Sequence, residues 1–391
     1  MPEVLDAEPA TEAPYILKGE HTQRVVKLIK MCWKRNKTPI LWGAPGNGKT
    51  ALVEALSREK ECVGMVRVLL GSADKADTLG MPNRGVIHGK HAEYQVTFHA
   101  DPHWAVNAQE AQDGDKHFIV FFDEIPQAEL DVQGTILTMI HDHIMPSGTK
   151  LGMHVKFICA GNPTDDVSSG YELIEPLQNR LSHVTYEPPR EEYLVGMREA
   201  WGKNVSPEER SLRAMIASYL QTRPDTHLHQ MPANGSKENA WPSRRSWDNF
   251  ASVGADVMGD QDMLTFVATS FIGEAMAMEF VAAMFLIKQH SPEEIITDPS
   301  IVDWNDPLTN LYHMTSLTSW ADNGEKLQKA IDVIGFASLN GPADIVALSL
   351  PEIGNKLGTV CSIAERSAIV KSLDKTTLHD YIHLMFGSGV A

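Results

Sequence analysis

Short apolar runs of strand length alternate with helical periodicity through the first half of the chain. Largely apolar runs, as in strands that are buried on both faces, lie at residues 38–42, 117–122 and 154–160. Residues 63–70 form a further predicted strand, and residues 86–98 alternate loosely, as a β-hairpin does. Apolar residues recur at helical spacing within residues 15–37, 51–57 and 130–143. The pattern predicts an α/β fold in which helices flank a parallel sheet.

The second half of the chain reads as helical. A helix is predicted to open at Pro207 and to run to about Thr222, and another is predicted over residues 263–289. The second contains a long apolar stretch, but Glu274 and Glu279 lie inside it. Carboxylates at bilayer depth are costly, so a buried helix of a helical domain is the better interpretation than a membrane span.

A chain of 391 residues is too long for one ordinary core, and the pattern divides it into four parts. We predict a mobile acidic tail at residues 1–14, an α/β nucleotide-binding domain at 15–190, a helical lid domain at 191–290 and a C-terminal helical extension at 291–391. The extension carries no catalytic constellation. Contact with a partner or another subunit and simple capping of the lid are equally good interpretations of it.

Charge and cysteine content narrow the classes of function. There are 51 acidic and 34 basic side chains, a net charge of −17, which disfavours sequence-independent nucleic-acid binding unless a basic patch is concentrated locally. No such run is evident. The four cysteines form no C-x-x-C pair, and the N-terminus lacks the features of a secretory signal. These observations favour a cytoplasmic protein.

The clearest chemical signal is the segment Gly43-Ala44-Pro45-Gly46-Asn47-Gly48-Lys49-Thr50, which fits the phosphate-binding pattern G-x-x-x-x-G-K-[ST]. It stands between a predicted strand and a predicted helix, where backbone N–H groups and the helix N-terminus converge on phosphates. Lys49 would reach the β- and γ-phosphates, and the Thr50 hydroxyl would face Mg²⁺. The segment therefore predicts ATP and Mg²⁺ as cofactors.

Polar side chains at the ends of two later strands complete a hydrolytic set. The strand at 117–122 ends in Asp123 and Glu124, where Asp123 would hold the Mg²⁺ shell and Glu124 would polarise the attacking water. The strand at 154–160 is followed by Asn162, whose amide can bond both the γ-phosphate and that water. Further on, Arg180 at a helix end is a candidate arginine finger that neutralises charge on the transferred phosphoryl group.

With the phosphate loop, the acidic pair, the asparagine and the arginine in this order, the sequence resembles an AAA+ ATPase. Within that superfamily it resembles the MoxR-like, dynein-related branch. Gly43–Thr50 corresponds to Walker A, residues 118–124 to Walker B, Asn162 to sensor 1 and Asn179-Arg180 to the arginine finger. The resemblance extends from about residue 15 to residue 190. It implies a homo-oligomer, typically a hexamer, in which Arg180 completes the site of a neighbouring subunit. It also implies remodelling of a partner protein, commonly one with a von Willebrand A-type domain.

The resemblance also implies a second arginine, sensor 2, which the helical lid delivers to the γ-phosphate. The segment Trp241-Pro242-Ser243-Arg244-Arg245-Ser246-Trp247 resembles that element. We favour Arg245 for this role, with Arg244 as the alternative. The family pattern more often has proline directly before the arginine, and Arg244 occupies that place here.

The leading hypothesis is thus a Mg²⁺-dependent ATP hydrolase that works on a protein partner, with no membrane contact. One alternative is a nucleotide-gated assembly module with little turnover, although such a switch has no need of Glu124, Asn162 and Arg180 together. A second is a nucleic-acid-associated motor on the same core, which the net charge disfavours. A small-molecule kinase ranks last, because it has no use for the sensor and finger residues.

Overall fold

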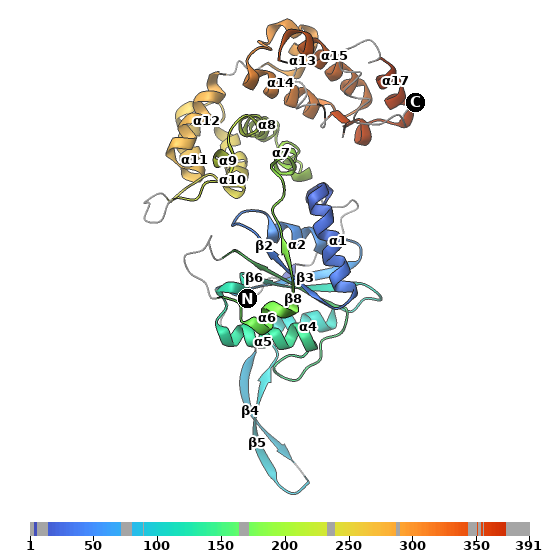
Figure 1. The fold of residues 1–391 in the computed structure, drawn as a ribbon, viewed down its shortest axis with the longest axis vertical. Coiled ribbons are helices and arrows are strands. Elements are labelled where there is room, and N and C mark those ends of the chain that lie inside the picture. The colour runs from blue at the N-terminus through green and yellow to red at the C-terminus, as the bar shows by residue number, and fades with distance from the viewer. Residues whose placement is uncertain are drawn as a thin grey trace. The chain divides into compact units, whose positions relative to one another are not determined.

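The computed structural model describes residues 4–5, 15–71, 80–88, 90–163, 172–232, 239–286, 290–342, 350, 353–354 and 356–372. The chain divides into two compact units, Met1–Pro189 and Arg190–Ala391 (Figure 1). Residues 373–391 of the predicted extension and most of the predicted tail lie outside the described residues. Within the tail, Val4 and Leu5 form a short strand, β1, which pairs with β3, so these two residues differ from the mobile tail predicted.

The first unit is built on a six-stranded sheet with the order β1-β3-β6-β7-β2-β8. Its strands are β1 (Val4–Leu5), β2 (Thr38–Trp42), β3 (Cys62–Leu69), β6 (His117–Asp123), β7 (Val155–Gly161) and β8 (Leu181–Thr185). All neighbouring strands are parallel except β1, which runs antiparallel to β3. The α/β fold with a parallel sheet is therefore confirmed.

Two hydrophobic clusters cover the two faces of this sheet, because successive side chains of a strand point to opposite faces. On β6, Ile119 and Phe121 pack into one cluster with α1 (Glu20–Lys34) and α2 (Lys49–Ser57). Phe118, Val120 and Phe122 pack into the other. That second cluster is formed with α4 (His103–Glu110), α5 (Leu130–Asp142) and α6 (Glu175–Arg180). A strand buried on both faces explains the unbroken apolar run in the sequence.

The predicted hairpin is a separate two-stranded sheet of β4 (Met81–His88) and β5 (Glu93–Ala100). Its antiparallel register runs from the pair Met81–Ala100 to the pair His88–Glu93. In Figure 1 it projects away from the main sheet of the same unit. Large apolar side chains remain exposed along it, among them Ile87, Tyr94 and Phe98.

In the part of the second unit that the structure describes, the regular elements are all helices. Its longer helices are α7 (Arg190–Arg198), α8 (Pro207–Gln221), α10 (Arg244–Gly254), α11 (Gln261–Ile272), α12 (Glu274–Leu286), α14 (Pro307–Trp320), α15 (Gly324–Asn340) and α17 (Ile363–Ser372). Two short helices are α9 (Asp225–Leu228) and α13 (Pro292–Thr297). Within the described residues, no helix is long and apolar enough to cross a membrane.

One predicted helix of this unit is wrong in its length. The helix predicted over residues 263–289 is divided into α11 and α12 at Gly273. Gly273 has a φ of 84°, a conformation that ends a helix and that side chains with a Cβ rarely adopt. Its amide still donates to Thr269 O at 3.2 Å, which closes the last turn of α11. Because the sequence is apolar on both sides of Gly273, its hydrophobic pattern does not indicate where the first helix ends.

The segments 191–290 and 291–391 lie in one compact unit with two hydrophobic clusters. Tyr312 of α14 packs into the cluster formed by α7 to α12, and its hydroxyl lies 3.3 Å from Ser211 Oγ on α8. The predicted lid and extension therefore share a packed contact.

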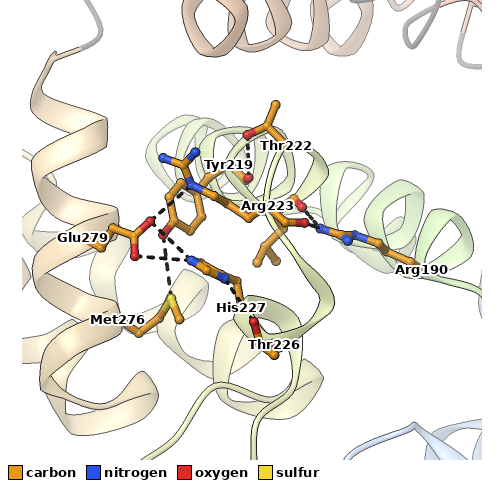
Figure 2. Close-up of polar contacts among 9 residues, drawn as sticks. Arg190, Tyr219, Thr222, Arg223, Thr226, His227, Met276 and Glu279 are labelled. Atoms are coloured by element: carbon orange, nitrogen blue, oxygen red, sulfur yellow. Dashed lines mark hydrogen bonds and ion pairs between the residues drawn. The ribbon is translucent and has the colours of Figure 1, made fainter.

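Polar contacts fasten the end of α8 to α12 (Figure 2). Arg223 Nε lies 3.2 Å from Glu279 Oε1, and His227 Nε2 lies 3.3 Å from Glu279 Oε2. Nearby, Arg190 donates to the carbonyl of Leu220, in the last turn of α8, and to the carbonyl of Arg223, just beyond that helix. Although partial burial of Glu279 acts to raise its pKa, the bonds from Tyr219 and His227 hold that pKa below its usual value.

A half-buried histidine, His117, is expected to make the stability of the first unit depend on pH. Burial lowers the pKa of His117 from 6.5 to about 4, and its ring packs against Trp33 at a centroid distance of 5.1 Å. Between pH 4 and pH 6.5, His117 is protonated in the unfolded chain but largely neutral in the folded chain. The free energy of unfolding therefore rises with pH in this range.

We expect the free energy of unfolding to fall by about 1–3 kcal/mol between about pH 7 and about pH 4 from this residue. A His117→Phe variant keeps a ring against Trp33 and should lose this part of the pH dependence in urea unfolding. Burial also lowers the pKa of His143, so a smaller slope should remain. An unchanged slope in the variant would assign the acid sensitivity to other groups.

Candidate functional site

The phosphate-binding segment Gly43–Thr50 lies between the carboxyl end of β2 and the first turn of α2. Gly46 and Gly48 have φ values of 85° and 86°, left-handed conformations that favour glycine. They let the loop fold back so that α2 begins directly at Lys49. The N–H groups of the first turn of α2 therefore lie beside the loop, as an anion site requires.

Lys49 joins this loop to the neighbouring strand β7. The residue is buried, and its Nζ donates to Gly43 O at 2.6 Å, to Ala44 O at 3.2 Å and to Asn162 Oδ1 at 2.7 Å. Asn162 directly follows β7, which pairs with β2 in parallel. Because parallel strands end at the same edge of the sheet, the predicted Walker A lysine and the predicted sensor 1 amide are brought together here.

Asp123, at the end of β6, is held by donors from two elements. Its Oδ2 accepts from Thr50 Oγ1 at 3.2 Å and from Arg67, with Nε at 3.0 Å and Nη2 at 2.6 Å. Its Oδ1 accepts from the Glu124 amide at 3.0 Å. The contact between Thr50 and Asp123 places the two predicted Mg²⁺ ligands side by side.

Arg67, on β3, is a site residue that the sequence analysis missed. Its side chain is 38% exposed, whereas that of Asp123 is 6% exposed, so the guanidinium closes the outer side of the carboxylate. The available signal was a cationic residue in a Val-rich strand that otherwise reads as buried. Such a residue is rare in a central strand unless it has a partner.

Glu124 adopts a strained turn immediately after β6. Its φ is 58°, which is uncommon for a residue with a side chain and is often found at functional sites. The turn directs its carboxylate toward the backbone after β3, since a Cβ added at Gly71 would lie 2.6 Å from Glu124 Oε2. The same position would lie 2.2 Å from Gln127 Oε1, so an amide group lies close to this carboxylate.

Arg180 lies at the end of α6 and is exposed. Its Nη1 donates to Pro176 O in the same helix at 3.1 Å. Among the described contacts, none joins it to Lys49, Asp123 or Asn162. The predicted arginine finger is therefore not brought to the site of its own chain.

The helix that carries Arg180 is nevertheless tied to the strand that precedes the phosphate loop. Trp42 Nε1 donates to His183 Nδ1 at 2.9 Å, and His183 Nε2 lies 2.9 Å from Gln178 O. An indole N–H can only donate, so Nδ1 must accept, and the neutral imidazole carries its proton on Nε2. His183 thus links Trp42, next to Gly43, with the carbonyl two residues before Arg180.

The predicted sensor 2 arginines lie in the second unit, at the N-terminus of α10. The Arg244 guanidinium lies over the Tyr193 ring, 5.5 Å from its centroid. Arg245 is exposed. Which of the two faces a nucleotide stays a prediction.

Removing the Arg67 guanidinium tests how Asp123 is held. In an Arg67→Met variant the buried carboxylate loses two charged donors, so the free energy of unfolding without nucleotide should fall by about 1–3 kcal/mol. Thermal melting should record this loss, and Mg²⁺ with ATP should reduce it, because a metal ion would replace the lost positive charge. Arg58→Met, at an exposed arginine, is the matched control. Equal melting temperatures for the two variants would contradict the assignment.

Comparison with known families agrees with this geometry. Residues 39–181 match the AAA domain of the dynein-related subfamily. The matched region includes the phosphate loop, Asp123, Glu124, Asn162 and Arg180. No curated protein matched the chain.

The solved structures that resemble the chain at low identity include two of NtrX from Brucella abortus. The first has 15% identity and a TM-score of 0.35, covering 62% of this chain and 52% of that one. The second, in complex with ATP, has 13% identity and a TM-score of 0.38, covering 91% of this chain and 68% of that one. A mutant of RuvB from Thermotoga maritima has 13% identity and a TM-score of 0.38, covering 73% of this chain and 78% of that one. The chain thus spans about half the length of the first NtrX structure.

Proposed function

We propose that this protein is a Mg²⁺-dependent ATP hydrolase that assembles into an oligomer and remodels a partner protein. The observation that carries the proposal is the pair of contacts Lys49–Asn162 and Thr50–Asp123 at one edge of the sheet. Together they join the phosphate loop to the ends of β6 and β7. The match of residues 39–181 to the AAA domain supports the same function.

The residues present fit ATP and Mg²⁺. The loop Gly43–Thr50 and the start of α2 offer backbone donors to the phosphates, and Lys49 offers a cation that can exchange its carbonyl partners for phosphate oxygens. Thr50 and Asp123 provide two oxygens for Mg²⁺, which retains water in its remaining positions. When bound, Mg²⁺ neutralises charge on the phosphates and polarises them.

The remaining side chains would carry the hydrolytic step. Glu124 would accept a proton from the attacking water, and Asn162 would orient that water by a hydrogen bond. Arg245, or alternatively Arg244, would contact the γ-phosphate from the second unit. Each group binds, orients or accepts a proton, as phosphoryl transfer requires little else from a protein.

We further propose that Arg180 acts on the site of a neighbouring subunit. Its exposed position and its contact within α6 support a role outside its own chain. The site is then complete only in an assembly, which we propose to be a hexamer, as is typical of the family resembled. The proposed substrate is a protein, with a von Willebrand A-type domain as the specific candidate.

The test is the dependence of ATP hydrolysis on Mg²⁺ and on protein concentration. We expect purified protein to release phosphate only with Mg²⁺, at a rate per subunit that rises with concentration as the subunits associate. Lys49→Ala serves as the inactive control. A rate per subunit that stays constant on dilution to monomers would exclude the shared site, and no Mg²⁺-dependent hydrolysis at any concentration would favour a nucleotide-gated assembly module.

A further inference from the structure

The outer face of α1 is strongly basic in an acidic protein. Residues 18–37 contain seven basic side chains and one acidic side chain, Glu20, although the whole chain has a net charge of −17. The basic residues alternate with apolar ones at helical spacing, and so they do not form a continuous run in the sequence. The net negative charge disfavours polyanion binding only where no basic patch is concentrated locally, and this face of α1 is such a patch.

The inner face of α1 fixes the direction of that basic face. Val25, Ile29 and Trp33 are buried in the cluster under the sheet, and Trp33 Nε1 donates to Phe157 O at 2.8 Å. Side chains three and four positions apart lie on the same side of a helix. Lys27, Lys30 and Lys34 therefore share one face.

These three lysines line a shallow open groove. Its other walls are partly apolar and come from α1, from the turn before it and from the turn after α2: Leu17, Gln23, Val26, Met31 and Glu59. Met31 is 57% exposed, and the neighbouring Leu28 is 38% exposed. The groove thus combines apolar contact surface with cationic edges.

The charge in the groove is only partly neutralised. Lys30 Nζ lies 2.8 Å from Glu59 Oε2 and 3.8 Å from Glu61 Oε2. Within the part of the chain that the structure describes, Lys27 and Lys34 have no carboxylate partner. Two positive charges, two helical turns apart, are left facing solvent on either side of an ion pair.

We propose that this groove binds an acidic, extended protein segment that also carries an apolar side chain. Lys27 and Lys34 are about 10 Å apart along the helix axis. A polyproline II segment brings residues three positions apart to the same side, at a separation of about 9 Å. Two carboxylates at that spacing would meet the two lysines. An apolar side chain between them points about a third of a turn to one side, where it would contact Met31 or Val26 on the flank of the lysine row.

A protein segment fits this groove better than a nucleic acid does. A phosphate backbone offers no apolar side chain for Leu17, Val26 and Met31. Net negative charge over the rest of the chain would also weaken the long-range attraction of a polyanion. The groove is separate from the phosphate loop, and the proposed binding does not depend on ATP turnover. Peptide binding can therefore be measured without nucleotide.

The test is fluorescence anisotropy with a labelled synthetic peptide in which two Glu residues stand three positions apart with a Leu between them. We expect the full chain to bind this peptide and Lys27→Glu with Lys34→Glu to weaken binding at least tenfold. The control, Lys150→Glu with Lys203→Glu, makes the same charge change at exposed lysines outside the groove and should stay within twofold. Peptides with Gln for Glu, or Ser for Leu, should bind more weakly to the unmodified protein.

Several outcomes would overturn the proposal. If the groove variant and the control variant weakened peptide binding equally, the weakening would be an effect of net charge alone. Tighter binding of a labelled single-stranded DNA oligonucleotide in the same salt, lost in the groove variant, would make this a nucleic-acid surface instead. Absence of any peptide binding to the unmodified protein would remove the docking site. Because all four lysines are exposed, equal melting temperatures should show that each variant is folded.

Discussion

Replacing Glu124 by Gln should leave ATP binding intact and lower turnover by about two to four orders of magnitude. Glutamine has nearly the same shape as glutamate but cannot accept a proton from the attacking water. The strained turn at Glu124 should persist, because the substitution leaves the backbone and the space beside Gly71 unchanged. The protein should therefore accumulate in its ATP-bound state, as a filter-binding or equilibrium dialysis experiment would show.

A nearby glutamate provides the control. Glu129 is exposed and precedes α5 in the same segment of the chain, so Glu129→Gln alters the same charge close to the site without touching it. We expect that variant to hydrolyse ATP at the unmodified rate. If Glu124→Gln also kept the unmodified rate, the proton acceptor would have to be another group, and Gln127 could not replace it because an amide is not a base at neutral pH.

Replacing Arg180 by Ala should lower turnover by about three to five orders of magnitude while each subunit still binds ATP. The guanidinium would contribute only when the γ-phosphoryl group separates, so its loss affects the rate far more than the affinity. Arg180 is exposed and has its described hydrogen bond within α6, so its removal should leave the fold intact. Arg210→Ala, at an exposed arginine of the second unit, is the control.

Mixing the two inactive variants distinguishes a shared site from one confined to a single subunit. If Arg180 serves its neighbour, a site formed by Glu124 of the Arg180→Ala subunit and Arg180 of the Glu124→Gln subunit is complete. Random mixing in equal amounts should restore roughly a quarter of the sites. A mixture that stays inactive although the subunits co-assemble would contradict action between subunits.

The sequence was sufficient for the parts of the site that lie at strand ends. The phosphate loop, Asp123 and Asn162 were predicted because a buried parallel strand is a recognisable apolar run, and the residue that follows it must lie at the edge of the sheet. Predicted and observed bounds of β6 and β7 agree closely for the same reason. The structure gives the positions of these residues, but the roles assigned to all the site residues stay predictions, since they concern bound nucleotide, chemistry and a neighbouring subunit.

Other features depend on contacts that periodicity does not encode. The bond between Arg67 and Asp123 requires the register of β3 against β6, which no local pattern gives. The break at Gly273 was hidden because both helices are apolar on either side of it. The basic face of α1 was missed because its lysines alternate with core residues, so the charge is gathered only when the helix forms.

The strand order has a consequence for how the protein is made. β2, which leads into the phosphate loop, pairs with β7 and β8, and Thr38 lies opposite Leu181. Neither partner exists until most of the first unit has been synthesised, and such distant pairing is slow because long loops must close first. In a nascent chain that ends before β7, β2 has neither of its partner strands, so the loop that follows β2 is not held at the edge of the sheet. Nucleotide should therefore be captured late in synthesis, as one of the last events in folding the first unit.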